Sequence, residues 1–240
     1  KIYDKFRLHY AIKANSNIAI LKILREEGVR VDCSNMNEIK TAKLVGFSSD
    51  QISYTGNYHG DNDLKTALEE NVIINLDDIS QFDRLIKIKV PEFISFRVNP
   101  EIGKAKFEVL VLGKKESKFG IPQTQIIEAY EKAKSSGVKR FGIHMMAGSC
   151  VLDENYFEKL TEKLMDIAGN ISKNLNIQFE FINIGGGFGI PYEPNERDLD
   201  IEKAAEKIVE KFKQKLQEHS LGEPWLLIEP GRYIIGDASI

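Results

Sequence analysis

Short apolar runs alternate with amphipathic stretches along nearly the whole chain. Eight runs have the length and the β-branched and aromatic content of buried strands. They lie at residues 9–15, 30–34, 52–55, 73–77, 92–98, 139–146, 179–185 and 225–230. Helical spacing of apolar residues is clearest in two of the stretches between them. One stretch carries Phe157, Leu160, Leu164, Ile167 and Ile171, and the other carries Ile201, Ala205, Ile208, Phe212 and Leu216. Both stripes predict helices that pack one face on a core.

Eight strand–helix units within 240 residues predict an α/β fold of the TIM (β/α)8 barrel type. A doubly wound sheet is the alternative, but it usually has fewer strands and a dinucleotide fingerprint after the first one. That fingerprint does not follow the first run, and no interdomain linker or short repeat occurs. The chain starts at Lys1, and the segment 236–240 resembles the start of another strand. We therefore expect the core of a longer protein.

Composition narrows the classes of partner. The chain is 42% hydrophobic and 29% charged, as is typical of a soluble globular protein, and it lacks an apolar run of the ~18 residues that span a membrane. A net charge of -3 indicates neither a nucleic acid nor a membrane surface as partner. Cys33 and Cys150 are too few for a disulfide framework, which favours a reducing, cytoplasmic location. The four histidines are scattered without metal-site spacing, so we expect no metal.

Polar side chains gather at the predicted strand ends, where TIM barrels carry their chemistry. Lys13 ends the first run. Burial of its unpaired ammonium would cost several kcal/mol, so a desolvated lysine there is suited to form a Schiff base with an aldehyde. The alternative is a lysine that reaches solvent from a strand end. The other strand ends carry Asp32, Thr55, Asn57, Asn75, Asp77, Arg97, Asn99, His144, Asn183 and Glu229. So many ionisable and amide groups on one rim indicate an active site rather than a structural network.

Three successive glycines, Gly185, Gly186 and Gly187, end the seventh run. Each costs backbone entropy, and close approach of a phosphate to bare N–H groups would require them. A tight left-handed turn is the alternative explanation, and the weaker one. Gly231 and Arg232 follow the eighth run, where barrels often bind phosphates, and Ser149 follows the sixth.

An amine, a phosphate cradle and a carboxylate on one rim are complementary to pyridoxal 5′-phosphate. Its aldehyde would meet Lys13, and Glu229 would keep its ring nitrogen protonated, which makes the ring a strong electron sink. Metal catalysis is the weaker hypothesis.

These motifs resemble the fold-type III pyridoxal-phosphate decarboxylases, a family of alanine racemase-like barrels, and within it most closely the diaminopimelate decarboxylases. The resemblance spans nearly the whole chain. It is carried by Tyr10-Ala11-Ile12-Lys13-Ala14-Asn15, Val31-Asp32-Cys33-Ser34 with Glu38, Thr55-Gly56-Asn57, Phe96-Arg97-Val98-Asn99-Pro100, Ser117-Lys118-Phe119-Gly120-Ile121, residues 144–149, Gly185-Gly186-Gly187-Phe188 and Glu229-Pro230-Gly231-Arg232.

The resemblance implies a role for each matching residue. Lys13 carries the cofactor, and Glu229 meets the ring nitrogen. The phosphate is surrounded by Gly185, Gly186, Gly187, Ser149, Gly231 and Arg232. Asp32 and Arg97 lie near the Schiff-base side, and Arg232 also contacts a substrate carboxylate.

One position departs from the family pattern. Family members carry a histidine stacked on the ring where this chain has Met146. A thioether contacts an aromatic face favourably, by about 0.3–1.5 kcal/mol. His144 precedes it by two residues on the same face of the strand, and we include it among the cofactor-binding residues.

By this resemblance the function is decarboxylation of an amino acid, with meso-diaminopimelate giving L-lysine and carbon dioxide as the favoured reaction. Ornithine, arginine, carboxynorspermidine or a carrier-bound amino acid could replace meso-diaminopimelate as the substrate. Two further hypotheses are a racemase, which Glu229 disfavours, and a non-catalytic carrier of pyridoxal phosphate. The resemblance also implies a homodimer, with a barrel over residues 1–232. Residues 233–240 would lead to a C-terminal β-domain, beyond this chain, whose Cys-Glu-Ser segment reaches the partner's active site.

Overall fold

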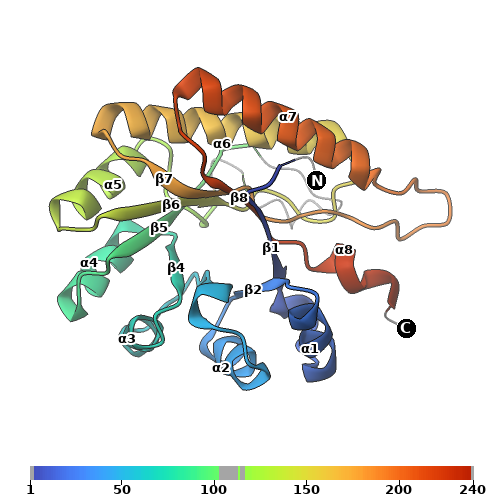
Figure 1. Ribbon diagram of the computed structural model, residues 1–240, viewed down its shortest axis with the longest axis horizontal. Helices are drawn as coiled ribbons and strands as arrows, with labels where there is room; N and C mark the ends of the chain where they lie inside the picture. The colour runs from blue at the N-terminus through green and yellow to red at the C-terminus, as the bar shows by residue number, and fades with distance from the viewer. Residues whose placement is uncertain (1–2, 103–112, 114–116, 239–240) are drawn as a thin grey trace.

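The computed structural model describes residues 3–102, 113 and 117–238, and its eight parallel strands form a closed barrel (Figure 1). The strands follow one another around the barrel in chain order, and β8 pairs with β1 to close it. Their bounds are β1 Phe6–Ala11, β2 Arg30–Cys33, β3 Ile52–Tyr54, β4 Ile73–Leu76, β5 Phe93–Val98, β6 Arg140–Met145, β7 Phe179–Asn183 and β8 Trp225–Ile228. The predicted TIM barrel is confirmed, and each of the eight predicted strands is present.

The helices lie outside the barrel, and α6 and α7 run side by side along one flank (Figure 1). Their bounds are α1 Ile18–Glu26, α2 Met36–Val45, α3 Asp61–Glu69, α4 Ile79–Ile88, α5 Ile126–Ser135, α6 Glu154–Leu175, α7 Ile201–His219 and α8 Arg232–Ile235. Short 3-10 turns occupy η1 Ile12–Ala14, η2 Ser49–Gln51 and η4 Gly236–Ala238. None of the described helices is long and apolar enough to cross a membrane.

Short polar side chains start several of these helices. Asn17, Asn35, Asp78, Asp153 and Asp200 each accept a hydrogen bond from a backbone N–H in the first turn of the helix that follows. Each such cap stabilises its helix by about 1 kcal/mol. The caps therefore fix the residues at which these helices begin.

Both predicted amphipathic helices exist. The stripe on α6 is buried as expected. On α7 the buried face is rotated slightly, because Ala204 is fully buried whereas Ala205 is only partly so.

The predictions for three strand ends and for the last segment are wrong. β7 stops at Asn183 and β8 at Ile228, before their predicted ends at 185 and 230. The first strand stops at Ala11, and Ile12–Ala14 form the 3-10 turn η1, so Lys13 lies in a turn beyond the strand. The expected strand at 236–240 is instead the 3-10 turn Gly236–Ala238, and residues 239–240 lie outside the described part of the chain. The apolar run of β1 continues through the buried Ile12, so the pattern does not show where that strand ends.

Candidate active site

A cavity of about 630 Å³ opens at the carboxyl ends of the strands. Six of the residues expected from sequence line it: Lys13, Ser149, Gly187, Glu229, Gly231 and Arg232. Its volume lies within the range of about 300–1,000 Å³ that is usual for small-molecule sites. The barrel therefore brings an amine, a carboxylate, a hydroxyl and a guanidinium to one cavity.

Lys13 is exposed to solvent rather than buried at a strand end. The expectation of a desolvated ammonium is thus wrong for this structure, because η1 lifts the side chain above the barrel interior. Two contacts hold the turn against β8. Ala11 N–H donates to the Pro230 carbonyl at 3.2 Å, and a Cβ on Gly231 would lie only 3.0 Å from Ala14 Cβ. Glycine at 231 is what permits the lysine turn to approach the end of β8.

Glu229 is a buried carboxylate with two side-chain donors. His144 Nε2 lies 2.9 Å from Oε2, and Asn183 Nδ2 donates to Oε1 at 2.6 Å. Burial alone would raise the pKa of Glu229, but the His144 contact, together with Lys13 and His9, lowers it to about 2. The group is therefore an anion at neutral pH, and its charge faces the cavity that Lys13 also lines.

Asp32 shows the opposite shift. Burial and the nearby Glu229 charge raise its pKa to about 8, although Lys13 and a hydrogen bond from Thr55 act in the other direction. Thr55 Oγ1 donates to Asp32 Oδ1 at 3.2 Å and in turn accepts from Asn75 Nδ2 at 2.9 Å. Two neighbouring carboxyl groups with pKa values pushed apart are typical of active sites.

Backbone packing requires the three glycines. Gly185 and Gly187 have left-handed φ values of +75° and +97°. A Cβ on Gly185 would lie 2.3 Å from the Met145 carbonyl oxygen, one on Gly186 would lie 2.2 Å from the Glu229 carbonyl oxygen, and one on Gly187 would lie 2.7 Å from the Gly148 carbonyl oxygen. A tight left-handed turn, the packing explanation for the glycine run, is therefore present. It brings Gly187 to the cavity wall.

The N–H groups of the first two glycines have partners inside the protein. Gly185 N–H donates to Asn183 Oδ1 at 2.9 Å, and Gly186 N–H contacts Met146 Sδ at 3.3 Å. Neither Gly185 nor Gly186 lines the cavity. In this structure they shape the turn, whereas Gly187 forms part of the cavity surface.

Asp32, Arg97 and His144 are also absent from the cavity lining and lie in the polar barrel interior beneath it. Arg97 donates to Asn57 Oδ1 at 3.1 Å and to the Met146 carbonyl at 3.2 Å. Burial lowers the pKa of Arg97, and the Asp77 carboxylate opposes that shift. Met146 itself reaches the cavity, at the position where the family pattern has a histidine.

Two residues of the site make contacts that the sequence did not indicate. Asn183 stood out only as a polar strand end, yet it contacts both Glu229 and Gly185. Its place immediately before the glycine run was the available signal. Tyr192 lines the cavity and accepts a hydrogen bond from Arg232, but it lies in a loop without periodicity, and nothing in its surroundings marks it.

A larger cavity, of about 1070 Å³, lies at the opposite end of the barrel. Much of its charge is internally paired, since Arg140 donates to Glu180 at 2.5 and 2.8 Å and lies 3.6 Å from Glu92. The amino-terminal face of a TIM barrel generally serves stability. Chemistry rather than size therefore identifies the smaller cavity as the candidate active site.

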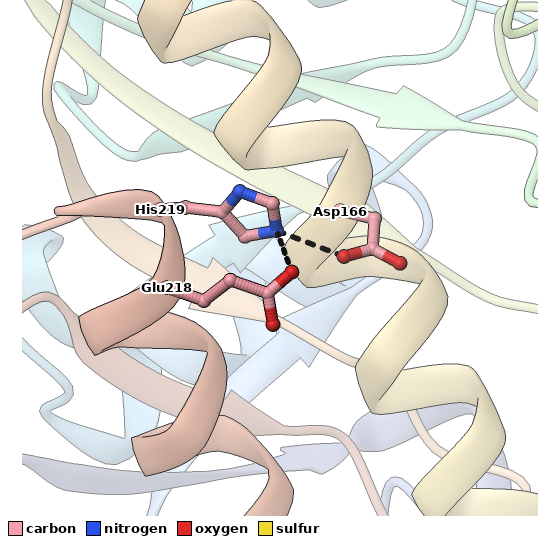
Figure 2. A group of neighbouring side chains, drawn as sticks. All are labelled: Asp166, Glu218 and His219. Carbon is pink, nitrogen blue, oxygen red and sulfur yellow. Dashed lines mark hydrogen bonds and ion pairs between the residues drawn. The ribbon is translucent and has the colours of Figure 1, made fainter.

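One group of described residues has the geometry of a metal site, Asp166, Glu218 and His219 between α6 and α7 (Figure 2). His219 Nε2 lies 2.8 Å from Asp166 Oδ1. Lys215 Nζ also lies 2.8 Å from Asp166 and 3.0 Å from Glu218, so one ammonium already forms ion pairs with both carboxylates. The group is an ion-pair network that joins two outer helices.

Comparison with known proteins places this site in a family. Residues 1–236 match the family described as the pyridoxal binding domain of the pyridoxal-dependent decarboxylases. The chain belongs to this family. Its cofactor is pyridoxal 5′-phosphate, and the cavity fits that group, because it combines an accessible amine, an anionic carboxylate and a glycine-lined wall beside Arg232.

Several relatives of this decarboxylase domain are named diaminopimelate decarboxylase. The protein of Methanothermobacter thermautotrophicus is 47% identical over 99% of this chain and 56% of its own length. That of Thermoplasma acidophilum is 34% identical over 99% of this chain and 57% of its own length. The crystal structure of the Helicobacter pylori diaminopimelate decarboxylase complexed with L-lysine superposes with a TM-score of 0.87 at 27% identity, over 97% of this chain and 59% of that one. The chain thus spans a little over half the length of these relatives.

Proposed function

We propose that this chain is the cofactor-binding barrel of an amino-acid decarboxylase that converts meso-diaminopimelate to L-lysine and carbon dioxide. The observation that carries the proposal is that Lys13 and Glu229 line one cavity from adjoining strand ends. Relatives at 34–47% identity that carry the name diaminopimelate decarboxylase support the choice of substrate.

The cavity residues divide into two groups by role. Lys13 Nζ would hold the cofactor covalently through its aldehyde. Ser149, Gly231 and Arg232, with the turn Gly185–Gly187, hold the phosphate. Arg232 also binds a substrate carboxylate, for which its planar pair of donors is suited.

Glu229 holds a proton on the ring nitrogen. When bound, pyridoxal phosphate supplies an electron-withdrawing ring that weakens the bond between the substrate's α-carbon and its carboxylate. An anionic Glu229 strengthens that effect by stabilising the positively charged ring nitrogen. Asp32 and Arg97, in the interior below, shape the electrostatic field around Lys13.

The complete protein would add a C-terminal β-domain after a barrel over residues 1–232, with residues 233–240 as the start of the connection. It would act as a cytoplasmic homodimer, without nucleic acid or membrane partners. The partial coverage of the relatives, 56–57% of their length, supports a second domain.

Carbon dioxide release by the full-length protein tests the function. The assay compares meso-diaminopimelate with lysine, ornithine and arginine. We expect turnover with meso-diaminopimelate alone. Turnover of another amino acid would keep the reaction class and overturn the substrate, whereas binding of cofactor without turnover of any of them would favour a carrier of pyridoxal phosphate.

A further inference from the structure

Three hydrogen bonds close a ring between the ends of β7 and β8. Asn183 Nδ2 donates to Glu229 Oε1 at 2.6 Å, Glu229 N–H donates to the Gly185 carbonyl at 2.8 Å, and Gly185 N–H donates to Asn183 Oδ1 at 2.9 Å. All three residues are buried. One amide side chain thereby connects the glycine turn to the carboxylate that faces the cavity.

The ring fixes the orientation of the Asn183 amide. Oxygen and nitrogen of an amide are assigned from their partners, and only the oxygen can accept from Gly185 N–H. The nitrogen must then face Glu229 and donate to it. Because a carboxyl oxygen that accepts this bond carries no proton there, Asn183 favours the ionised form of Glu229.

A purely structural asparagine at a strand end needs only backbone partners. Here one of its two hydrogen bonds goes to a buried carboxylate, and isolating such a charge from water costs several kcal/mol unless it is paired and hydrogen-bonded. Glu229 lines the Lys13 cavity, and so does Gly187, two residues beyond Gly185 in the same turn. Asn183 would therefore contact neither the phosphate nor the ring nitrogen of the cofactor. It lies between the glycine turn and Glu229, which are proposed to face those two groups.

We propose that Asn183 is a positioning residue that sets the glycine turn and the Glu229 carboxylate at a fixed relation to each other, so that one cofactor molecule meets both. The inference rests on the proposed roles of Gly185–Gly187 at the phosphate and Glu229 at the ring nitrogen. It assigns the coupling between those two contacts to a single side chain.

Two substitutions distinguish the hydrogen bond to Gly185 from the hydrogen bond to Glu229. Asn183→Ala removes both side-chain hydrogen bonds. Asn183→Asp keeps an oxygen to accept from Gly185 N–H but replaces the donor to Glu229 by a second carboxylate, and two carboxylates at that distance share a proton. Ser172→Ala is the matched control, because it deletes a buried 2.7 Å hydrogen bond, to the Ile177 carbonyl, without contacting Glu229, its partners or the turn.

The first measurement uses the full-length protein and two ligands, pyridoxal phosphate and pyridoxal, which differ only in the phosphate. The ratio of the dissociation constant for pyridoxal to that for pyridoxal phosphate reports the phosphate contact. We expect Asn183→Ala to reduce this ratio by about fivefold or more, the equivalent of one hydrogen bond of ~1 kcal/mol. Asn183→Asp and Ser172→Ala should leave it within about twofold of the wild type.

The second measurement is the absorbance of bound pyridoxal phosphate as a function of pH, which responds to the charge opposite the ring nitrogen. We expect both Asn183 variants, and not Ser172→Ala, to alter it. If both Asn183 variants behave as Ser172→Ala does in both measurements, the inference is overturned. If Asn183→Ala does not fold, Asn183→Asp provides the test. An altered pH dependence of the absorbance with an unchanged ratio of dissociation constants supports the coupling. An altered ratio contradicts it. Failure of the wild type to bind pyridoxal phosphate would instead overturn the proposed function itself.

Discussion

His144 Nε2 lies 2.9 Å from Oε2 of Glu229 inside the barrel, although 85 residues separate the two in the chain. The other nitrogen of the ring, Nδ1, has no hydrogen-bond partner among the described residues. The contact with Glu229 therefore accounts for the position of this buried histidine. The sequence suggested that His144 contacts the cofactor, whereas the structure places it behind the carboxylate.

The first prediction concerns Glu229→Gln in the full-length protein. Glutamine keeps the shape and can still bind Asn183 or His144, but it cannot hold a charge opposite the ring nitrogen. We expect kcat to fall on the order of 100-fold, the scale for loss of one electrostatic contact at a reacting centre, with little change in cofactor affinity. Equal turnover of wild type and variant would show that the ring nitrogen has another partner.

The second prediction concerns Lys13. Borohydride reduction of the protein loaded with pyridoxal phosphate, followed by peptide mass mapping, is expected to place the adduct on Lys13. Lys13→Ala should abolish it, whereas Lys22→Ala, an exposed lysine on the nearby helix α1, should not. An adduct on a different lysine would remove the basis of the proposed function.

Periodicity was sufficient to predict the barrel, because eight apolar runs with helical patterns between them have few other arrangements. It misplaced the end of the first strand, since Ile12 is as buried as a strand residue and only the backbone shows that it lies in a 3-10 turn. The burial of Lys13 was predicted because it was placed at the end of that strand, so this prediction is wrong as well.

The sequence indicated part of the cavity lining but not the contacts that its residues make. Lys13, Ser149, Gly187, Glu229, Gly231 and Arg232 meet at one cavity as expected. That Gly185 N–H is used by Asn183 could not be predicted, because a strand-end position does not determine a side-chain rotamer. Close backbone packing and phosphate binding would each require glycine at these positions, and the sequence alone does not distinguish the two.

The third prediction tests that packing. Gly186 does not have a positive φ, so alanine there is opposed by sterics alone, with its Cβ 2.2 Å from the Glu229 carbonyl oxygen. We expect Gly186→Ala to lower the free energy of unfolding by about 1–3 kcal/mol, as overpacked sites do, and to weaken cofactor binding. Gly60→Ala is the control, since its nearest contact is a flexible side-chain oxygen at 3.3 Å. Equal denaturation midpoints for the two variants would contradict the steric argument.

The fourth prediction is a pH dependence of stability. Burial raises the pKa of Asp32 to about 8 in the folded protein, against a value near 4 when it is unfolded. The folded state then binds the additional proton, so the contribution of Asp32 is complete below pH ~4 and is lost as pH rises toward 8. Asp32→Asn should therefore flatten the fall in stability between pH 5 and 8 in the cofactor-free protein, measured by urea denaturation.

The control for Asp32 is an exposed carboxylate with the opposite shift. A hydrogen bond from Ser48 lowers the pKa of Asp50, so its contribution is present above the unfolded pKa and is lost as pH falls. Asp50→Asn should leave the slope between pH 5 and 8 unchanged. An unchanged slope in Asp32→Asn as well would mean that Asp32 is ionised in the folded protein across that range.

The last prediction is that a protein consisting of residues 1–240 binds pyridoxal phosphate yet releases little carbon dioxide from meso-diaminopimelate. The residues proposed to bind the cofactor all lie within this span, and those that line the cavity meet there without help from other segments. Protonation of the substrate carbon, however, needs an acid within hydrogen-bond reach, and the family resemblance assigns that acid to a cysteine in the C-terminal β-domain of the partner. Cys150 does line the cavity, but its thiol donates to the Ile190 carbonyl at 3.5 Å and its backbone is held in a left-handed conformation. Carbon dioxide release by the 240-residue protein and by the full-length protein should be compared at saturating cofactor. Full activity of the shorter protein that is lost in Cys150→Ser would show that the barrel supplies its own acid.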